Sequence, residues 1–255
     1  MAMVPDQRDW RFCTKCTMLF FNDVLRDNRG TCPRDHQGHD PRGFNFEPQF
    51  HPDLDLADTP TTQSRWRFCG KCHVMFFQGS PPRDRKCAAD GGTHEEIGFH
   101  FMLPVNRAGA PALVPETPTG QGGWRFCGKC TSLFFDGFAD KGVCPRDDGG
   151  HASIGDTFVL PHDQHPSIRL TFIEPENRNR VLVSGIGFVP DERVVFLRDF
   201  HTSSGGFNQG PGGETRTDNN GNFDFDLDLG QAHVTNLNVQ AQDAFTSLVA
   251  VDHLD

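Results

Sequence analysis

Apolar and polar residues alternate along the last third of the chain in the manner of half-buried β-strands. Phe223–Leu229 is the clearest case, since an aspartate stands between successive apolar residues. A period of two turns one face of a strand toward a core and the other toward water. The segments with strand character are Ile168–Ile173, Val181–Ser184, Val194–Leu197, Phe223–Leu229, Leu237–Ala241 and Ser247–Val251. These short strands, without a helical period, predict an antiparallel β-sandwich over residues 166–255.

The first two thirds of the chain repeat one pattern three times, at intervals of 56 and 58 residues. Such a period indicates tandem units of one supersecondary structure. Each copy opens with Trp-Arg-Phe-Cys, at Trp10–Cys13, Trp66–Cys69 and Trp124–Cys127. A Phe-Phe segment and a later apolar segment follow, each bounded by turn residues. We therefore expect an all-β chain whose first part contains three small ribbon modules, over residues 8–47, 64–104 and 122–161.

Every cysteine belongs to one of these copies, and each copy also supplies a histidine. The spacing is Cys-x2-Cys, a loop of 13 to 15 residues, and then Cys-x6-His. Three thiolates and one imidazole complete the tetrahedral shell of a structural Zn2+ and leave no position open for water. The expected ligands of three zinc ions per chain are Cys13, Cys16, Cys32, His39, Cys69, Cys72, Cys87, His94, Cys127, Cys130, Cys144 and His151.

Two alternatives concern these metal sites. In the first copy His36 lies close to His39 in sequence and is a second candidate for the fourth ligand. The rival to zinc is an iron–sulfur cluster on three cysteines and a histidine, whose ligand spacing is tighter at both ends than the spacing found here. A module of about 40 residues buries too little apolar surface to fold without a staple, which favours structural zinc.

Each copy also places basic residues beside its cysteines. A zinc ion with three thiolates and a neutral imidazole carries a net charge of about −1, which nearby cations offset. We expect this role for three arginines and for the three lysines between the first two cysteines. They are Arg11, Arg67, Arg125, Lys15, Lys71 and Lys129.

The tryptophans of the chain are Trp10, Trp66 and Trp124, one beside each group of cysteines. They have two interpretations. They form a ladder of ligand platforms on which sugar rings stack, or each packs on the Phe-Phe strand as a small core. The core interpretation is favoured, because a small module needs its large side chains for packing.

The formal net charge is −10, and residues from Ser167 onward include six basic and 13 acidic side chains. This balance argues against binding to nucleic acid or to an anionic membrane surface. No apolar run approaches 18 residues, so no membrane insertion is expected. The first residues lack the pattern of a secretory signal, and free thiolate ligands favour a reducing compartment. The expected location is the cytoplasm, or the cell surface or outside after export by a signal-independent route.

Both parts of the chain resemble known bacterial modules. Val183–Pro190 and Thr217–Phe223 resemble the strand-and-turn and hairpin motifs of bacterial immunoglobulin-like domains. The resemblance implies a β-sandwich of a type that mostly serves as a spacer or adhesive module on secreted or surface proteins. The repeats are similar to tandem W-R-F-C-x-K-C modules of uncharacterised bacterial proteins, which implies zinc binding.

The sequence shows no nucleophile–base pair, phosphate loop or paired-carboxylate cleft, so we expect no enzymatic activity. The leading hypothesis is a zinc-stabilised binding or adhesion protein that presents repeated modules to a cell-envelope glycan, a protein partner or copies of itself, since weak sites in series gain avidity. One alternative is a structural subunit of an extracellular filament or injection-type assembly, with the zinc ribbons as rigid spacers. Another, a nucleic-acid-binding zinc protein, is disfavoured by charge and ligand spacing. The pattern leaves open whether the modules are linked flexibly or pack on one another.

Overall fold

The structure is a computed structural model that describes residues 5–23, 25–230, 233–246 and 249–254. It divides the chain into two compact units, the first ending at Asp163 and the second spanning Gln164–Asp255. Within the described residues, strands account for the regular structure apart from one short 3-10 helix, Pro82–Asp84. The predicted all-β class is therefore confirmed. The three copies of the cysteine pattern all lie in the first unit.

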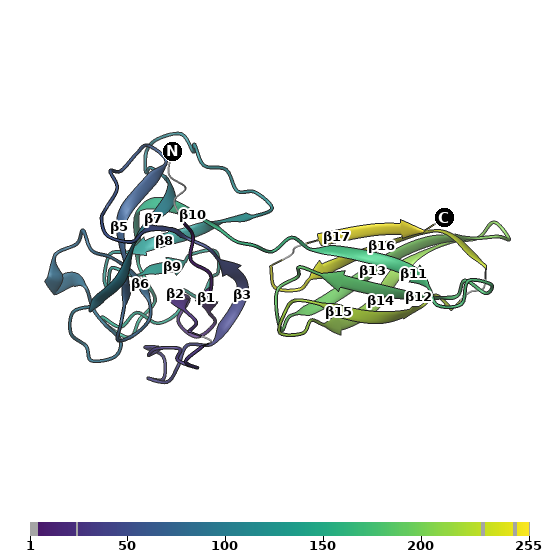
Figure 1. The fold of residues 1–255 in the computed structure, drawn as a ribbon, viewed down its shortest axis with the longest axis horizontal. Coiled ribbons are helices and arrows are strands. Elements are labelled where there is room, and N and C mark those ends of the chain that lie inside the picture. Colours follow the sequence, from purple (N-terminus) through teal and green to yellow (C-terminus); the bar gives the residue numbers. More distant parts are fainter. Residues whose placement is uncertain (1–4, 24, 231–232, 247–248, 255) are drawn as a thin grey trace. The chain divides into compact units, whose positions relative to one another are not determined.

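The strands of the first unit follow the three copies in order (Figure 1). Each copy contributes a strand that ends at its first cysteine, a three-residue return strand of Leu-Phe-Phe or Met-Phe-Phe, and a later strand. In the first copy these are β1 (Trp10–Cys13), β2 (Leu19–Phe21) and β3 (Pro41–Phe46), followed by β4 (Gln49–His51). In the second they are β5 (Thr62–Cys69), β6 (Met75–Phe77) and β7 (Glu96–Asn106). In the third they are β8 (Gly120–Cys127), β9 (Leu133–Phe135) and β10 (Ser153–Pro161).

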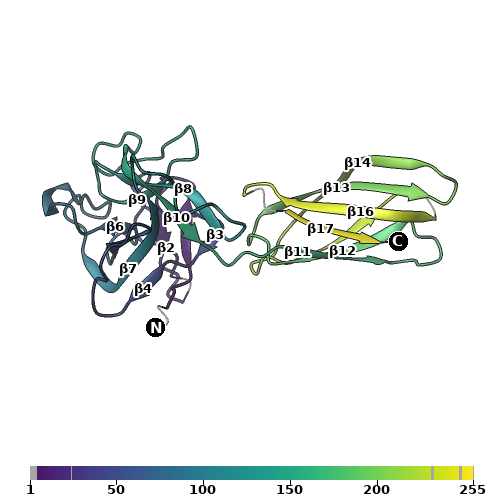
Figure 2. The same cartoon turned by 90° about the horizontal axis from the view of Figure 1, so that it is seen from above.

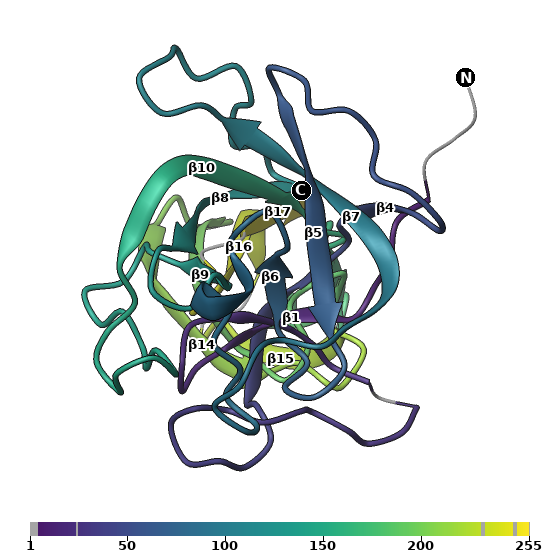
Figure 3. The same cartoon turned by 90° about the vertical axis from the view of Figure 1, so that its left-hand side faces the viewer.

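The same antiparallel pairing recurs in each copy. The first strand lies between the return strand and the later strand, which gives the orders β2-β1-β3, β6-β5-β7 and β9-β8-β10. The later strands also pair across copies, because β7 pairs with β10 and with β4. Residues Phe46 and His162 form a further bridge between the first and third copies. Figure 3 shows β7 and β10 as long curved strands on the outside of this unit.

The three return strands meet at the centre of the first unit. Antiparallel bridges join Phe20 to Val74, Phe76 to Ser132, and Met18 to Phe134. Each bridge connects a different pair of copies, so the three bridges close a ring. The modules are therefore not linked flexibly. They pack on one another in a closed cycle.

Aromatic side chains repeat this cycle around the centre. Each tryptophan meets, edge to face, a phenylalanine from the later strand of the next copy, with ring centroids 5.0–5.1 Å apart. The pairs are Trp10 with Phe101, Trp66 with Phe158, and Trp124 with Phe46. This geometry is a favourable one for aromatic rings. The third copy thus packs on the first as the first packs on the second.

The second unit consists of two antiparallel sheets with the orders β11-β12-β15 and β14-β13-β16-β17. The four strands of the second sheet lie side by side in this order in Figure 2. The strands are β11 (Ser167–Phe172), β12 (Arg180–Ile186), β13 (Arg193–Thr202), β14 (Phe207–Arg216), β15 (Phe223–Asp228), β16 (Val234–Asp243) and β17 (Val249–Leu254).

Alternation along these strands builds the core of the second unit. In β15 the side chains of Phe223 and Leu227 are buried, whereas Asp224, Asp226 and Asp228 are exposed, as the period of two predicts. Residues from both sheets, such as Val183 and Phe196, belong to one buried cluster. The sheets therefore face each other across this cluster, in the arrangement of a β-sandwich.

Candidate metal centres

The structure brings together the twelve residues predicted as zinc ligands, in three groups of four. In each group the donor atoms lie within 4.8 Å of one another and all four residues are buried. The groups are Cys13, Cys16, Cys32 and His39; Cys69, Cys72, Cys87 and His94; and Cys127, Cys130, Cys144 and His151. In the first group the ligand is His39, which is 1% exposed, while the rival candidate His36 is exposed.

The separations between donor atoms fit zinc. Each histidine Nδ1 lies 3.4–3.6 Å from the sulfur of the second cysteine, and two sulfur–sulfur separations are 3.9 and 4.0 Å. Zn–S and Zn–N bonds of about 2.3 and 2.0 Å in a tetrahedron place sulfur atoms about 3.8 Å apart and sulfur and nitrogen about 3.5 Å apart. Three Cys3His clusters of this size fit three zinc ions per chain.

Tight turns hold the cysteines of each cluster. After the first cysteine the chain turns so that the Thr17 amide donates to the Cys13 carbonyl oxygen, at 2.8 Å. The residue after the second cysteine has a positive φ in every copy, at Thr17, His73 and Thr131. These turns bring the first two cysteine sulfurs of each copy into one cluster. A Cys-x2-Cys spacing permits this geometry but does not by itself require it.

Without a metal, the three thiols of a cluster do not ionise together. Burial raises the pKa of Cys13, but hydrogen bonds with Cys16 and Cys32 lower it overall, so the first thiol ionises at the expense of the other two. Burial raises the pKa of Cys16 well above its ordinary value, and the neighbouring sulfurs raise it further. A hydrogen bond with Cys13 raises the pKa of Cys32 to about 12, and Cys144 in the third copy behaves in the same way. A bound divalent cation supplies the positive charge that lets three buried sulfurs ionise together. The donor set therefore suits Zn2+ chemically as well as geometrically.

One face of each liganding imidazole is covered by a phenylalanine. Phe20 stacks on His39, Phe76 on His94 and Phe134 on His151, with centroids 4.6–4.8 Å apart and ring planes 19–21° from parallel. These phenylalanines come from the return strands and are fully buried. The Phe-Phe segments therefore orient the metal ligands as well as filling the centre of the unit.

Two of the three imidazoles also reach a polar group of the next copy. His39 Nε2 lies 3.1 Å from the carbonyl oxygen of Cys72, and His94 Nε2 lies 3.5 Å from the hydroxyl of Ser132. Such partners fix the ring and its tautomer in metal sites. Nε2 of His151 is buried and has no hydrogen-bond partner among the described residues.

The lysines between the cysteines connect the two turns of each cluster. Lys15 pairs with Asp35 at 2.8 Å, Lys71 with Asp90 at 2.6 Å and Lys129 with Asp147 at 2.8 Å. The ion pair with Asp90 raises the pKa of Lys71, and the negative charge of Cys87 adds to this effect. The lysines therefore lie in the field of the thiolates, in agreement with the charge-offset role.

The arginines bond to a different part of the module. Arg11 and Arg125 donate to the carbonyl oxygens of Gly43 and Gly155, on the later strands. Arg67 is 4% exposed and forms a two-point ion pair with Asp55, at 2.9 and 3.0 Å. These bonds tie the first strand of a copy to its surroundings, and the charge-offset role of the arginines stays a prediction.

The three tryptophans are buried, each with 0% exposure. Their indole N–H groups donate to Gln7, Gln63 and Gln121, each three residues earlier, at 3.1–3.2 Å. A ring without exposed surface cannot stack on a sugar. The interpretation of Trp10, Trp66 and Trp124 as ligand platforms is therefore wrong in this structure, and the core interpretation applies.

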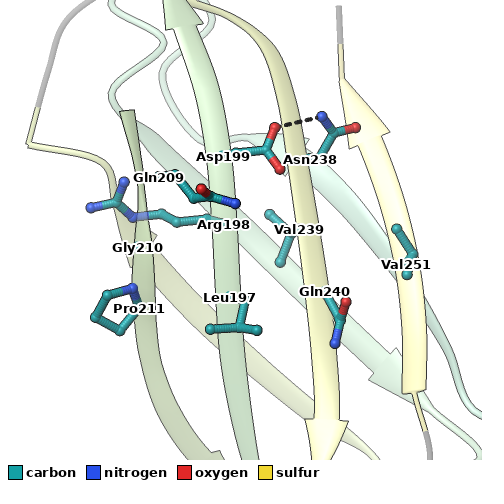
Figure 4. Close-up of a pocket in the computed structure, with 10 residues that line it drawn as sticks. All are labelled: Leu197, Arg198, Asp199, Gln209, Gly210, Pro211, Asn238, Val239, Gln240 and Val251. Atoms are coloured by element: carbon teal, nitrogen blue, oxygen red, sulfur yellow. Dashed lines mark hydrogen bonds between the residues drawn. The ribbon is translucent and has the colours of Figure 1, made fainter. Parts of the chain in front are cut away.

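The second unit carries a recess that sequence reasoning missed. It lies on the four-stranded sheet, has a volume of about 350 Å³ and is lined by side chains from all four strands (Figure 4). They include Leu197, Asp199, Gln209, Pro211, Asn238, Gln240 and Val251. Asn238 donates to Asp199 at 2.8 Å. The signal in the sequence was weak, because β14 contains Gly210, Pro211, Gly212 and Gly213 and does not read as a strand.

No family model matches the chain, and no curated protein matches it. The described residues include no helix long and apolar enough to cross a membrane. The resemblances to W-R-F-C-x-K-C modules and to bacterial immunoglobulin-like domains stay predictions. The metal centres are therefore assigned from their own geometry, as three buried Cys3His groups that suggest zinc-binding modules.

Proposed function

We propose that this protein is a non-enzymatic binding protein in which a zinc-built scaffold accompanies a β-sandwich that binds glycans. The observation that carries the proposal is the recess on the four-stranded sheet of the second unit. The tryptophans of the repeated modules are buried. We therefore place the ligand contact at this recess and not on the repeats.

The side chains of the recess suit the chemistry of a sugar ring. Gln209, Asn238 and Gln240 carry amides, which both donate to and accept from hydroxyl groups, and Asp199 carries an accepting carboxylate. A sugar presents hydroxyls at its edge and C–H groups on its faces, and aliphatic side chains supply a surface for the latter. Leu197 and Val251 are 51% and 63% exposed beside the amides.

The charge of the recess favours a neutral ligand. Asp199 is the acidic residue that lines it, and Arg198 is the basic one. The Arg198 guanidinium lies over the ring of the buried Phe200, 5.0 Å from its centroid. A phosphate-rich polymer needs several exposed cations, which this surface does not offer among the lining residues. The volume lies at the lower end of the range of about 300–1,000 Å³ typical of small-molecule sites, which suits one or two sugar units.

Retention on insoluble polysaccharides, followed by titration calorimetry with the matching oligosaccharides, tests this proposal. Asp199→Ala removes the carboxylate of the recess, and we expect it to weaken retention by about 10-fold or more, because a hydrogen bond to a charged group contributes about 1.5–3 kcal/mol. Asp224→Ala is the matched control, since Asp224 is exposed on β15, in the other sheet. A wild-type protein that binds no glycan tested, or equal losses in both variants, would contradict the proposal.

A second candidate function is assembly into a filament or injection-type apparatus. It is favoured by the edges of the four-stranded sheet, where β14 and β17 are the end strands. Phe207 on β14 and Val249 on β17 are 59% and 42% exposed. Open strand edges with apolar side chains can pair with another chain. Light scattering that rises with protein concentration, and falls in a Phe207→Lys variant, would support assembly over glycan binding.

A further inference from the structure

We propose that the three zinc sites load and release their ions as one unit, because each copy holds the metal-binding turn of a neighbouring copy in place. The proposal concerns the first unit alone and does not depend on what the second unit binds. It follows from the way contacts run from one cluster to the next, and not from the ligands themselves.

The liganding imidazoles make the first set of these contacts. His39 belongs to the first cluster, yet its Nε2 meets the carbonyl oxygen of Cys72, a ligand residue of the second cluster. His94 of the second cluster meets Ser132, which follows Cys130 of the third by two residues. Each of these imidazoles is therefore held between its own zinc site and the turn that shapes the next one.

The backbone closes the cycle that the imidazoles begin. The Phe21 amide donates to the His73 carbonyl oxygen, the Phe77 amide to Thr131, and the Phe135 amide to Thr17, each at 2.9 Å. The accepting residue directly follows the second cysteine ligand of its copy in every case. The donor directly follows the phenylalanine that stacks on a histidine ligand. Each copy thus fixes a metal-binding turn of its neighbour.

The junction between the third and first copies is close even without a hydrogen bond from His151. Gly142 has a φ of +66°, and a Cβ placed on it would lie 2.2 Å from the Cys16 carbonyl oxygen. The Thr17 hydroxyl donates to the Lys141 carbonyl oxygen at 3.2 Å. The loop before the third cysteine of the last copy therefore packs directly against the Cys-x2-Cys turn of the first copy.

This arrangement makes the binding of one ion depend on the others. Without zinc, nothing joins the four ligands of a cluster, and the turns that carry them lose their anchor. The disordered turn then no longer offers a carbonyl oxygen or hydroxyl to the neighbouring imidazole, nor an acceptor to the neighbouring return strand. Intermediates with one or two ions hold an incomplete ring and are disfavoured relative to the empty and full states.

Native mass spectrometry of the full chain during titration with EDTA tests the proposal directly. We expect chains with three zinc ions and chains with none to dominate throughout, with species of one and two ions always minor. A stepwise series, in which the two-ion and one-ion species dominate in turn, would overturn it.

A ligand variant provides a second test. His39→Ala removes a donor from the first cluster only, and we expect the purified protein to contain close to zero zinc ions per chain. His36→Ala is the control, because His36 is exposed and outside the cluster, and it should retain three. A His39→Ala protein that keeps two zinc ions would show that the sites are independent.

A third variant leaves all twelve ligands in place, so it remains informative if His39→Ala does not accumulate. Ser132→Ala removes the partner of His94 Nε2, and loss of such a partner weakens metal sites by about 10-fold or more. Because the three ions load together, a 10-fold loss in the binding constant of one site is shared among them, and we expect the free zinc concentration for half-loading to rise by about 2-fold for all three ions together. Ser153→Ala, at an exposed position of the same copy, should leave it unchanged. A shift confined to one ion per chain, or no shift, would overturn the proposal.

Discussion

Cysteine and histidine ligands occupy the centre of the first unit, whereas the core of the second unit consists of hydrocarbon side chains from two facing sheets. In the first unit one buried cluster contains all nine cysteines together with Met18, Phe20, Val74, Ala88, Phe76 and Phe134. In the second unit the corresponding cluster contains valine, leucine, phenylalanine and alanine. We therefore expect the first unit to depend on metal for a stable core, and the second to depend on apolar burial.

The difference teaches how a short repeat can reach a stable fold. A copy of about 40 residues has too few apolar side chains to bury a core alone. Here the turns of each copy bring four metal ligands together, where a bound ion would join them, and the return strands of the three copies form the common centre. The second unit needs neither device, because its long alternating strands supply two complementary apolar faces.

Removal of zinc should produce the largest difference in stability between the two units. We expect an excess of EDTA to unfold the first unit and to leave the second folded, since structural zinc supplies folding free energy directly. All three tryptophans belong to the first unit, so tryptophan fluorescence reports its unfolding alone. Hydrogen exchange measured by mass spectrometry follows β11–β17 in the same sample. A first unit that stays folded without zinc would contradict this account.

A core substitution in the second unit should have the opposite effect and destabilise the second unit alone. Phe196 is 1% exposed and stacks on Phe225 across the two sheets. We expect Phe196→Ala to lower the free energy of unfolding of the second unit by about 3–5 kcal/mol. Zinc content and the tryptophan fluorescence melt should not change. Denaturant titration followed by hydrogen exchange measures the free energy of unfolding, and elemental analysis measures the zinc content. A drop in zinc content would show that the units are not energetically separate.

A glycine substitution tests the close packing between copies. We expect Gly142→Ala to destabilise the first unit by about 2–5 kcal/mol, from left-handed strain together with the clash with Cys16. Gly155→Ala is the control, because Gly155 has the same φ of +66° and no neighbouring atom within 4 Å of a Cβ. It should cost only about 1–2 kcal/mol. Equal losses in the chelator-free fluorescence melt would mean that contact between the copies is unimportant.

The smallest effect concerns a buried carboxylate of the second unit. Burial raises the pKa of Asp243, which is 0% exposed and has one oxygen without a hydrogen-bond partner among the described residues. The folded state therefore holds a proton that the unfolded state has released, so stability falls as the pH rises from 3.8 through the folded-state pKa. Asp243→Asn should remove this slope and make the second unit slightly more stable at neutral pH. Urea unfolding at several pH values, with Asp224→Asn as the control, measures the change.

The sequence allowed the prediction of features that depend on local chemistry. Ligand identity followed from the spacing of residues such as Cys13, Cys16 and His39, because metal geometry restricts which spacings close a shell. Strands such as β15 followed from their period of two. The strand β14 was missed, since glycine and proline at positions 210–213 hide its pattern.

Features that depend on contacts between distant residues could not be predicted. Nothing in the repeat spacing indicates that Phe21 meets His73 or that Trp124 meets Phe46. Similar copies with this spacing can be linked flexibly or can pack into a ring. The role of Arg67 depended on Asp55, twelve residues earlier in the segment before β5, which the repeat spacing does not indicate. Long-range packing decided these cases.

Elemental analysis of the purified full-length protein tests the central claim most directly. The account predicts three zinc ions per chain, no iron and no visible colour, in agreement with the three Cys3His clusters. Iron with visible absorption, or a metal-free protein that keeps its tryptophans buried, would contradict it.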